Sequence, residues 1–256
     1  MYIAMPTPTN PFRRGEVPRG SLFDTDRTST SSLDAARAAY TAAQEAFEAK
    51  EKNKAWVIAW AETAGRDAAW VEETFEISAD AVHCGGDLDL ADTKIQELPP
   101  GLTVGGNLNL ANTKIQELPP GLTTVKGDLN LEGTNIQELP PGLTVGGNLN
   151  LANTKIQELP PGLTTVKGDL NLEGTNIQEL PPGLTTVKGD LNLEATKIQE
   201  LPPGLTTVKG DLNLAFTNIQ ELPPGLTVGG GLSLAHTKIQ ELPPGLTVGG
   251  DLNLAY

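Results

Sequence analysis

The sequence is poor in cysteine, histidine and aromatic residues, with one cysteine (Cys84), two histidines and 4% aromatics among 256 residues. A single cysteine cannot close an internal disulfide, which excludes a small scaffold held together by disulfides. The longest uninterrupted apolar run, Ala55 to Ala61, is seven residues long, whereas a membrane-spanning helix needs about twenty. The N-terminal segment has no apolar stretch typical of a Sec signal. We therefore expect neither a membrane span nor a cleaved Sec signal.

Basic residues are scarce as well. Eighteen Lys and Arg stand against 32 Asp and Glu, which gives an acidic chain with a net charge of −14. A surface this acidic repels phosphate, so nucleic acid is excluded as the main partner.

A repeated motif fills the chain from residue 87 to its end. Full copies, 20 or 21 residues long, begin at Asp87, Asn107, Asp128, Asn148, Asp169, Asp190, Asp211 and Gly231, and a partial ninth begins at Asp251. The one-residue difference always lies where Leu-Thr-Val alternates with Leu-Thr-Thr-Val. An insertion confined to one place predicts a loop or a loosely paired stretch there.

The apolar positions within a copy predict its geometry. From Val125 to Leu131, apolar residues or glycine alternate with polar ones, a period of two that predicts a short strand. The Pro-Pro-Gly segment at 140–142 predicts a turn or extended backbone, because proline fixes φ and has no amide donor. Each copy is thus one coil whose apolar side chains are buried only when coils stack.

The segment from Leu129 to Pro140, with the pattern Leu-x-Leu-x-x-Thr-x-Ile-x-x-Leu-Pro, resembles the leucine-rich repeat, most closely its short bacterial Leu-Pro class. The resemblance implies a repeat solenoid of parallel β-strand coils, forming an arc or rod. Threonine stands where that family usually has an asparagine, at Thr134 and its equivalents. A three-faced parallel β-solenoid therefore remains the alternative.

The first 86 residues have a different composition and predict two further parts. Residues 1–32 contain four prolines, the pair Arg13-Arg14 and a Thr/Ser run, so we expect an extended arm that anchors the chain. Residues 33–86 predict an α-helical cap, with helices from Ser31 or Ser32 to about 52, from 54 to 64, and after Asp67. The cap covers the first coil of the solenoid at 87–256, and its core contains three tryptophans: Trp56, Trp60 and Trp70.

Few residues are candidates for catalysis or metal binding. His236 lies in a slot that varies between copies, and no metal-ligand or nucleophile spacing surrounds His83 and Cys84. Cys84 is expected to fill a small buried gap next to the cap. We predict that the protein is not an enzyme and has no cofactor and no metal site.

The outward positions of the Leu-x-Leu strand form two polar rows, which would be the ligand-facing surface of a leucine-rich-repeat arc. Carboxylates about 4.8 Å apart could bind calcium, but an amide ladder along the stack fits the pattern better. The Gln-Glu-Leu-Pro-Pro of each copy predicts a solvated row of glutamates. The candidate binding residues of the strand face are Asp128, Asn130, Asp169, Asn171, Asp190, Asn192, Asp211 and Asn213.

These features predict a non-catalytic interaction or structural scaffold: a repeat rod anchored by its arm and cap to a larger assembly, such as a virus or phage particle. The alternative is a secreted bacterial effector that binds a host protein through the solenoid, because the short Leu-Pro class resembles such effectors. A Thr/Asn array that binds ice or carbohydrate is a further alternative. Partners would be proteins, a capsid or tail assembly, or a second copy at the open C-terminal edge. The protein would be virion-associated, cytoplasmic in a bacterium, or secreted without a Sec signal.

Overall fold

The computed structural model describes the backbone of residues 28–255 and the side chains of residues 32–255. The arm expected at 1–32, with Arg13 and Arg14, therefore lies outside the described residues except at its end, which is helical. The chain divides into two compact units, Met1–Gln44 and Glu45–Tyr256. Neither described helix is long and apolar enough to cross a membrane.

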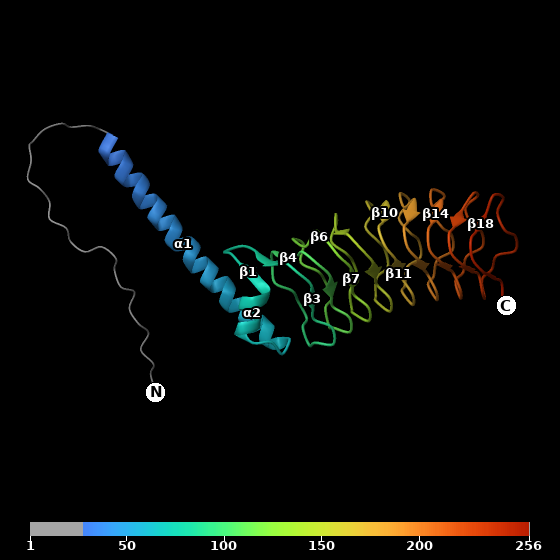
Figure 1. Cartoon of the computed structure of the whole chain (residues 1–256), viewed down its shortest axis with the longest axis horizontal. Helices are drawn as coiled ribbons and strands as arrows, with labels where there is room; N and C mark the ends of the chain where they lie inside the picture. The colour runs from blue at the N-terminus through green and yellow to red at the C-terminus, as the bar shows by residue number, and fades with distance from the viewer. Residues whose placement is uncertain (1–27, 256) are drawn as a thin grey trace, which may run out of the picture. The chain divides into compact units, whose positions relative to one another are not determined.

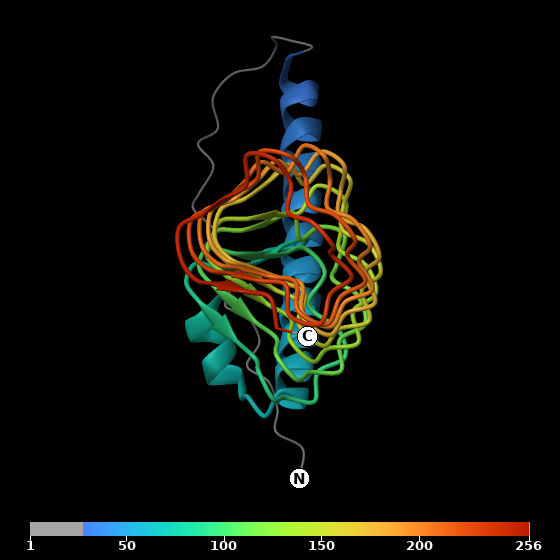
Figure 2. The ribbon, with the colours of Figure 1, turned by 90° about the vertical axis from the view of Figure 1, so that its right-hand side faces the viewer.

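Residues 87–255 form a parallel β-solenoid whose complete coils each contribute two very short strands, while the partial last coil contributes one (Figure 1). Seen along the stack, successive coils superpose closely (Figure 2). One strand per coil enters a continuous nine-stranded sheet, called here the Leu-x-Leu sheet. It contains β3 (Leu88–Asp89), β5 (Leu108–Asn109), β7 (Leu129–Asn130), β9 (Leu149–Asn150), β11 (Leu170–Asn171), β13 (Leu191–Asn192), β15 (Leu212–Asn213), β17 (Leu232–Ser233) and β19 (Leu252–Asn253).

The other strand of each coil enters one of two five-stranded sheets, called here the Thr-Val sheets. The first contains β1 (Phe75–Ile77), β2 (Val82–Cys84), β4 (Leu102–Val104), β6 (Thr124–Val125) and β8 (Thr144–Val145), and the second β10 (Thr165–Val166), β12 (Thr186–Val187), β14 (Thr207–Val208), β16 (Thr227–Val228) and β18 (Thr247–Val248). The strand predicted from Val125 to Leu131 is thus two strands in different sheets. The chain bends between them, where the alternation of side chains continues through Lys126-Gly127-Asp128.

The third side of each coil, from Thr-Lys/Asn-Ile to Pro-Pro, is extended but contains no strand. Hydrogen bonds between coils are sparse here, as in the bond from the Lys114 N–H to the Ile95 carbonyl (3.1 Å). Prolines at the end of this side offer no amide donors, which prevents a regular ladder. A coil therefore has three sides, of which two carry sheets.

The interior is one continuous column of aliphatic side chains. Leu149, Leu170 and Leu191 are in register in neighbouring strands, and Leu170 and Leu191 are fully buried. The repeat threonine is also inside: Thr134 is 2% exposed, and its hydroxyl donates to the Leu131 carbonyl of the same coil (2.7 Å). In the described residues no buried side-chain N or O atom lacks a hydrogen-bond partner. The hydroxyl of the repeat threonine therefore bonds within its own coil and not to a neighbouring coil.

The N-terminal part differs in detail from the three helices expected. A single helix, α1 (Thr28–Thr63), replaces the first two, since Asn53 does not interrupt it. The second helix, α2 (Ala68–Thr74), begins after Asp67, whose carboxylate accepts the Trp70 N–H (2.9 Å) as the N-cap. Strand β1 then pairs antiparallel with β2, and this hairpin, which the sequence did not predict, closes the first Thr-Val sheet.

An aromatic cluster joins this cap to the first coil. Trp60 is 5% exposed and packs edge-on against Phe75, with ring centroids 6.1 Å apart. Its indole N–H donates to the carbonyl of Glu97 in the first coil (2.8 Å). Trp70 also packs edge-on against Phe75, with ring centroids 5.4 Å apart. Two of the three tryptophans are thus part of the junction, whereas Trp56 is 37% exposed.

The one-residue length difference between coils is absorbed in the Pro-Pro-Gly turn. In the short coils this glycine is left-handed, with φ of +71° at Gly101, +80° at Gly142, +72° at Gly225 and +76° at Gly245. In the long coils the corresponding glycines, among them Gly204, do not have a positive φ. A proline followed by a left-handed glycine is typical of a type II turn. In the long coils, which have a second threonine before the valine, the turn no longer requires a left-handed residue at the glycine position.

This difference predicts opposite effects for the same substitution in adjacent coils. Gly225→Ala should destabilise the protein by about 1–2 kcal/mol, because a Cβ disfavours left-handed backbone; no atom lies within 4 Å of the added carbon, so the effect is purely conformational. Gly204→Ala should stabilise by about 0.4–1 kcal/mol through the unfolded chain. Urea unfolding of both variants tests this, and equal shifts in stability would contradict the assignment of two turn types.

The two Thr-Val sheets are separate because no ladder joins β8 to β10. This is a step from a short coil to a long one. At the other such step, from β4 to β6, only Val104 and Val125 remain paired. Leu143 and Leu163, beside the interruption, are half-buried, whereas their equivalents Leu122 and Leu184 are fully buried. The Leu-x-Leu sheet continues across the same step, where β7 pairs with β9, so the interruption is confined to one side.

Candidate interaction surfaces

The structure brings the predicted strand-face residues together in two rows on the outer side of the Leu-x-Leu sheet. In the first row, each Asp or Asn accepts the backbone N–H of its counterpart one coil onward. For example, Oδ1 of Asp169 accepts the N–H of Asp190 (2.8 Å), and Oδ1 of Asp190 accepts that of Asp211 (2.7 Å). Asp128 and Asn148 do the same in their coils. One oxygen of each first-row residue thus joins neighbouring coils.

The glycine that precedes a first-row residue is required by this ladder wherever the preceding coil has an Asp or Asn in the first row. A Cβ at Gly189 would overlap Oδ1 of Asp169, and one at Gly210 would overlap Oδ1 of Asp190. The Gly-Asp and Gly-Asn pairs of the repeat are therefore a structural unit, in which glycine leaves room for the carboxylate or amide oxygen. This also explains why the glycine recurs in every coil.

The second row makes local bonds instead. Oδ1 of Asn192 accepts the N–H of Glu194 two residues on (3.0 Å), an Asx turn that ends the strand. Its Nδ2 donates to Oε2 of Glu173 in the preceding coil (3.1 Å), and Asn213 contacts Glu194 in the same way (2.8 Å). Asn130 and its counterparts make the same turn. Both rows are held rigidly, and part of their hydrogen-bonding capacity is already used within the solenoid.

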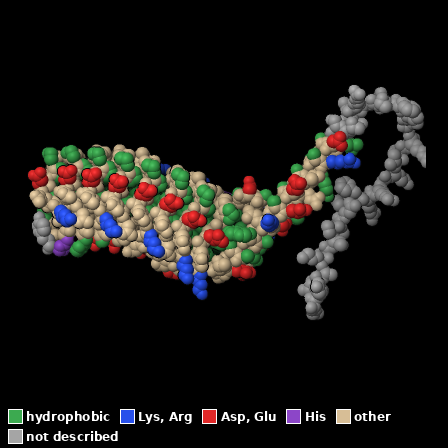
Figure 3. All heavy atoms as spheres, turned by 180° about the vertical axis from the view of Figure 1, so that it is seen from behind, with side chains coloured by type: hydrophobic (Ala, Val, Ile, Leu, Met, Phe, Trp, Pro, Cys, Tyr) green, Lys and Arg blue, Asp and Glu red, His purple; other side chains and the backbone are tan. Residues whose placement is uncertain are grey.

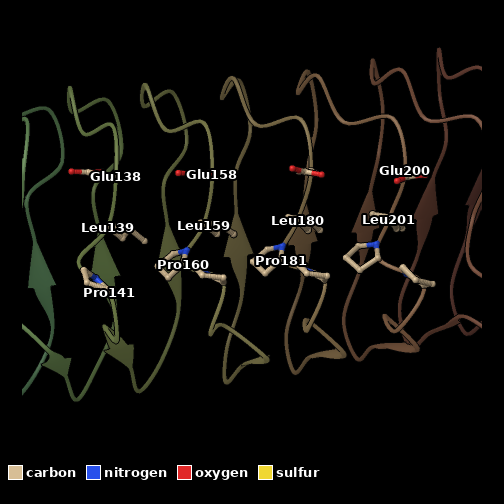
Figure 4. Close-up of a pocket in the computed structure, with 15 residues that line it drawn as sticks. Glu138, Leu139, Pro141, Glu158, Leu159, Pro160, Leu180, Pro181, Glu200 and Leu201 are labelled. Atoms are coloured by element: carbon tan, nitrogen blue, oxygen red, sulfur yellow. The ribbon is translucent and has the colours of Figure 1, made fainter.

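A groove on the third side of the coils is the surface that sequence reasoning missed. It has a volume of about 570 Å³ and crosses four coils, with the Glu-Leu-Pro-Pro segments at 138–141, 158–161, 179–182 and 200–203 at its edge (Figure 4). The leucines are buried, whereas the second proline of each pair is exposed. An apolar strip of prolines thus lies beside a row of carboxylates, and Figure 3 shows such rows running along the solenoid.

The carboxylates of this groove form no ion pair within the described residues. No hydrogen bond or ion pair joins the side chains of Glu138, Glu158, Glu179 or Glu200 to another described residue. Like charges about one coil spacing apart, roughly 4.8 Å, repel one another. The sequence predicted a solvated glutamate row here, but the recurrence of Leu-Pro-Pro directly after each glutamate was the signal for an adjoining apolar strip.

Two further cavities adjoin other surfaces. One, about 760 Å³, lies between α1 and the first coils and is lined by Trp56, Trp60, Lys94, Glu97 and others. The other, about 210 Å³, opens at the interruption between β8 and β10 and is lined mainly by apolar residues, including Leu143 and Leu163.

The histidines and the cysteine lie apart from these surfaces. Cys84 is buried, as predicted, and burial raises the pKa of its thiol, so it stays protonated. Nδ1 of His83 lies 2.7 Å from the Thr103 hydroxyl. His236 is exposed and left-handed (φ +53°), and its ring stacks on Phe216 with centroids 4.6 Å apart. No group of three or more His, Cys, Asp or Glu residues within the described part could hold a metal ion.

No protein-family model matches the chain, and no curated protein is significantly similar to it. The parallel β-solenoid with its Leu and Thr periodicity is compatible with a repeat protein.

Proposed function

We propose that the protein is a non-catalytic scaffold that binds a protein partner along the Glu-Leu-Pro-Pro groove and is held in a larger assembly by its N-terminal arm and cap. The coils would be a short Leu-Pro form of the leucine-rich repeat, and the assembly a virus or phage particle. The observation that carries the proposal is the groove itself, which crosses four coils and combines exposed prolines with unpaired carboxylates.

The character of the solenoid supports a scaffold. One aliphatic column runs through the coils, from Leu88 in the first to Leu232 in the eighth, and the Asp/Asn ladder adds bonds between neighbours. A rod built this way keeps its surface groups at fixed spacing, so a partner that fits one coil fits the next. Binding a repetitive segment in this way needs little reorganisation of the rod.

The groove selects a partner of definite chemistry. Its carboxylates attract Lys and Arg, and its proline strip favours apolar contacts. A polyproline II segment places every third side chain on one side, about 9.3 Å apart. This matches two coil spacings, about 9.6 Å. We therefore expect an extended segment with a basic residue at every third position and apolar residues between.

A peptide of two Arg-Pro-Pro repeats, about as long as the four-coil groove, provides a direct test, with a Glu-Pro-Pro peptide of equal length as the negative probe. Glu158→Lys, Glu179→Lys and Glu200→Lys together reverse the charge of the groove at exposed positions and should weaken binding of the Arg peptide at least tenfold, about 1.4 kcal/mol. Fluorescence anisotropy measures the affinity.

The matched control reverses three glutamates of the same row outside this groove: Glu117→Lys, Glu221→Lys and Glu241→Lys. It changes the net charge by the same amount, so a non-specific electrostatic attraction would fall equally in both triple variants. We expect the control to bind within about threefold of the wild type. Equal losses in the two variants, or no binding of the Arg peptide to the wild type, would refute the groove as the binding surface.

A further inference from the structure

Helix α1 carries an apolar seam that no described residue covers. Leu33, Tyr40 and Phe47 are 62%, 73% and 63% exposed, although large apolar side chains at heptad spacing normally face another helix. Ala36 and Ala43 lie between them at the alternate heptad positions, and both are exposed. The seam ends at Lys50, because the next seam position, Lys54, is bound by Glu72 of α2 (2.7 Å).

We propose that this seam, from Leu33 to Lys50, pairs with the same seam of a second copy of the chain in an antiparallel two-helix coiled coil. The proposal goes beyond the scaffold function, since it concerns a different surface and a different partner. Three features of the seam favour a second copy in this orientation.

The first feature is the alternation of large and small side chains. In a parallel pair, heptad positions of one kind face each other, so Tyr40 would meet Tyr40 and Ala43 would meet Ala43. Crowded layers would then alternate with empty ones. In an antiparallel pair, each large residue faces an alanine: Tyr40 meets Ala43 of the other copy, and Phe47 meets Ala36. Facing large and small residues fill such layers evenly.

The second feature is the length of the seam. With Tyr40 facing Ala43, the two-fold axis passes between Thr41 and Ala42, the midpoint of the stretch from Leu33 to Lys50. This register therefore uses the whole seam. At its ends, Leu33 faces Lys50, whose aliphatic stem covers the leucine while its ammonium group stays in water.

The third feature is charge at the edge of the seam. In the antiparallel register, Arg37 of one copy lies beside Glu51 of the other, twice by symmetry, and the helical side chains lean toward each other there. A parallel pair would instead place Arg37 beside Ser32 and Glu51 beside Ala46, without any opposite charge. Such flanking charges decide orientation in coiled coils.

The full chain should therefore have the mass of two copies in light scattering coupled to size exclusion, and should dissociate on dilution. Tyr40→Asp with Phe47→Asp should raise the dissociation constant at least about 30-fold, because charges enter two facing layers. The control, Ala38→Asp with Ala49→Asp, adds the same charge at exposed positions outside the seam and should remain dimeric. Circular dichroism verifies that both variants keep the solenoid.

Disulfide trapping distinguishes the two orientations. Tyr40→Cys and Ala43→Cys are made in separate, differently tagged chains, each with Cys84→Ala so that no other thiol reacts. Antiparallel pairing predicts a cross-link only when the two chains are mixed, because residue 40 faces residue 43. Cross-linking of either chain alone would show parallel pairing and overturn the proposal. A monomeric wild type, or a dimer that persists in the Tyr40→Asp, Phe47→Asp variant, would overturn it too.

Discussion

Leu170→Asp should lower the free energy of unfolding by about 3–5 kcal/mol at neutral pH. Leu170 is fully buried and lies in register between Leu149 and Leu191 of the neighbouring coils. The substituted carboxylate would lose its water without gaining a partner, because the surroundings are aliphatic. Each coil contacts only its neighbours. Exchange of backbone amide hydrogens should therefore accelerate first in the coil that contains residue 170 and in the two coils next to it.

The loss should depend on pH in a defined direction. Burial raises the pKa of an aspartate above the value of about 3.9 that it has in the unfolded chain. Below pH of about 4 the carboxyl is protonated in both states, so the part of the penalty due to charge disappears. As pH rises through the unfolded pKa, the unfolded state releases the proton first and the variant loses stability. Urea unfolding at several pH values measures this.

Leu252→Asp is the matched control, since Leu252 occupies the same slot in the last coil but is 42% exposed. Its side chain keeps contact with water, so the substitution should cost no more than about 1 kcal/mol. If Leu170→Asp and Leu252→Asp had the same stability, the stacked aliphatic column could not be the source of the fold's stability.

Trp60→Ala should cost about 3–5 kcal/mol and should loosen the N-terminal coils before the C-terminal ones. The indole fills the junction between α1 and the first coil, packs against Phe75, and donates to the carbonyl of Glu97. Its removal leaves a cavity at the place where the solenoid is closed. Hydrogen exchange of β2, β3 and β4 reports the loss locally, and urea unfolding gives its total size.

Trp56→Ala provides the control for the loss of an indole from the same helix. Trp56 lies one turn earlier and is 37% exposed, so its removal should cost about 1 kcal/mol or less. Uniformly faster exchange along the solenoid after Trp60→Ala would contradict a local role at the cap. Equal effects of the two substitutions would show that the junction does not depend on the buried ring.

Much of the fold could be predicted from residue spacing. The period of the copies predicted stacked coils, and the inward positions Leu129, Leu131 and Ile136 are fully buried, whereas Leu143 is half-buried. The confinement of length changes to the Leu-Thr-Val segment predicted a loop or a loosely paired stretch there, and in the structure the Pro-Pro-Gly turn before it changes conformation with coil length. Cys84 was predicted to be buried and is. These properties depend on local pattern and on the need to hide apolar side chains.

Other features could not be read from the pattern. Alternation from Val125 to Leu131 predicted one strand, because periodicity does not report where the backbone bends between two sheets. Asn53 was expected to separate two helices, but its side chain donates to the Ser78 carbonyl (2.9 Å) while the helix continues. The β1–β2 hairpin lies before the first repeat, and its residues do not follow the repeat pattern, so the pattern could not predict it. The strand-face residues were predicted to meet, and they do, but their role in binding stays a prediction.

Residue composition and spacing along the chain are enough to specify the repeat, most of the inward side chains and the acidic, cysteine-poor character of the protein. Which carboxylates are engaged in hydrogen bonds depends instead on how the coils stack. Asp169 and Asp190 use an oxygen to join coils, whereas Glu158 and Glu179 line an open groove without a partner. On the side of the Leu-x-Leu sheet, backbone N–H groups of the next coil reach the aspartates. On the side of the groove, prolines have no N–H group to donate.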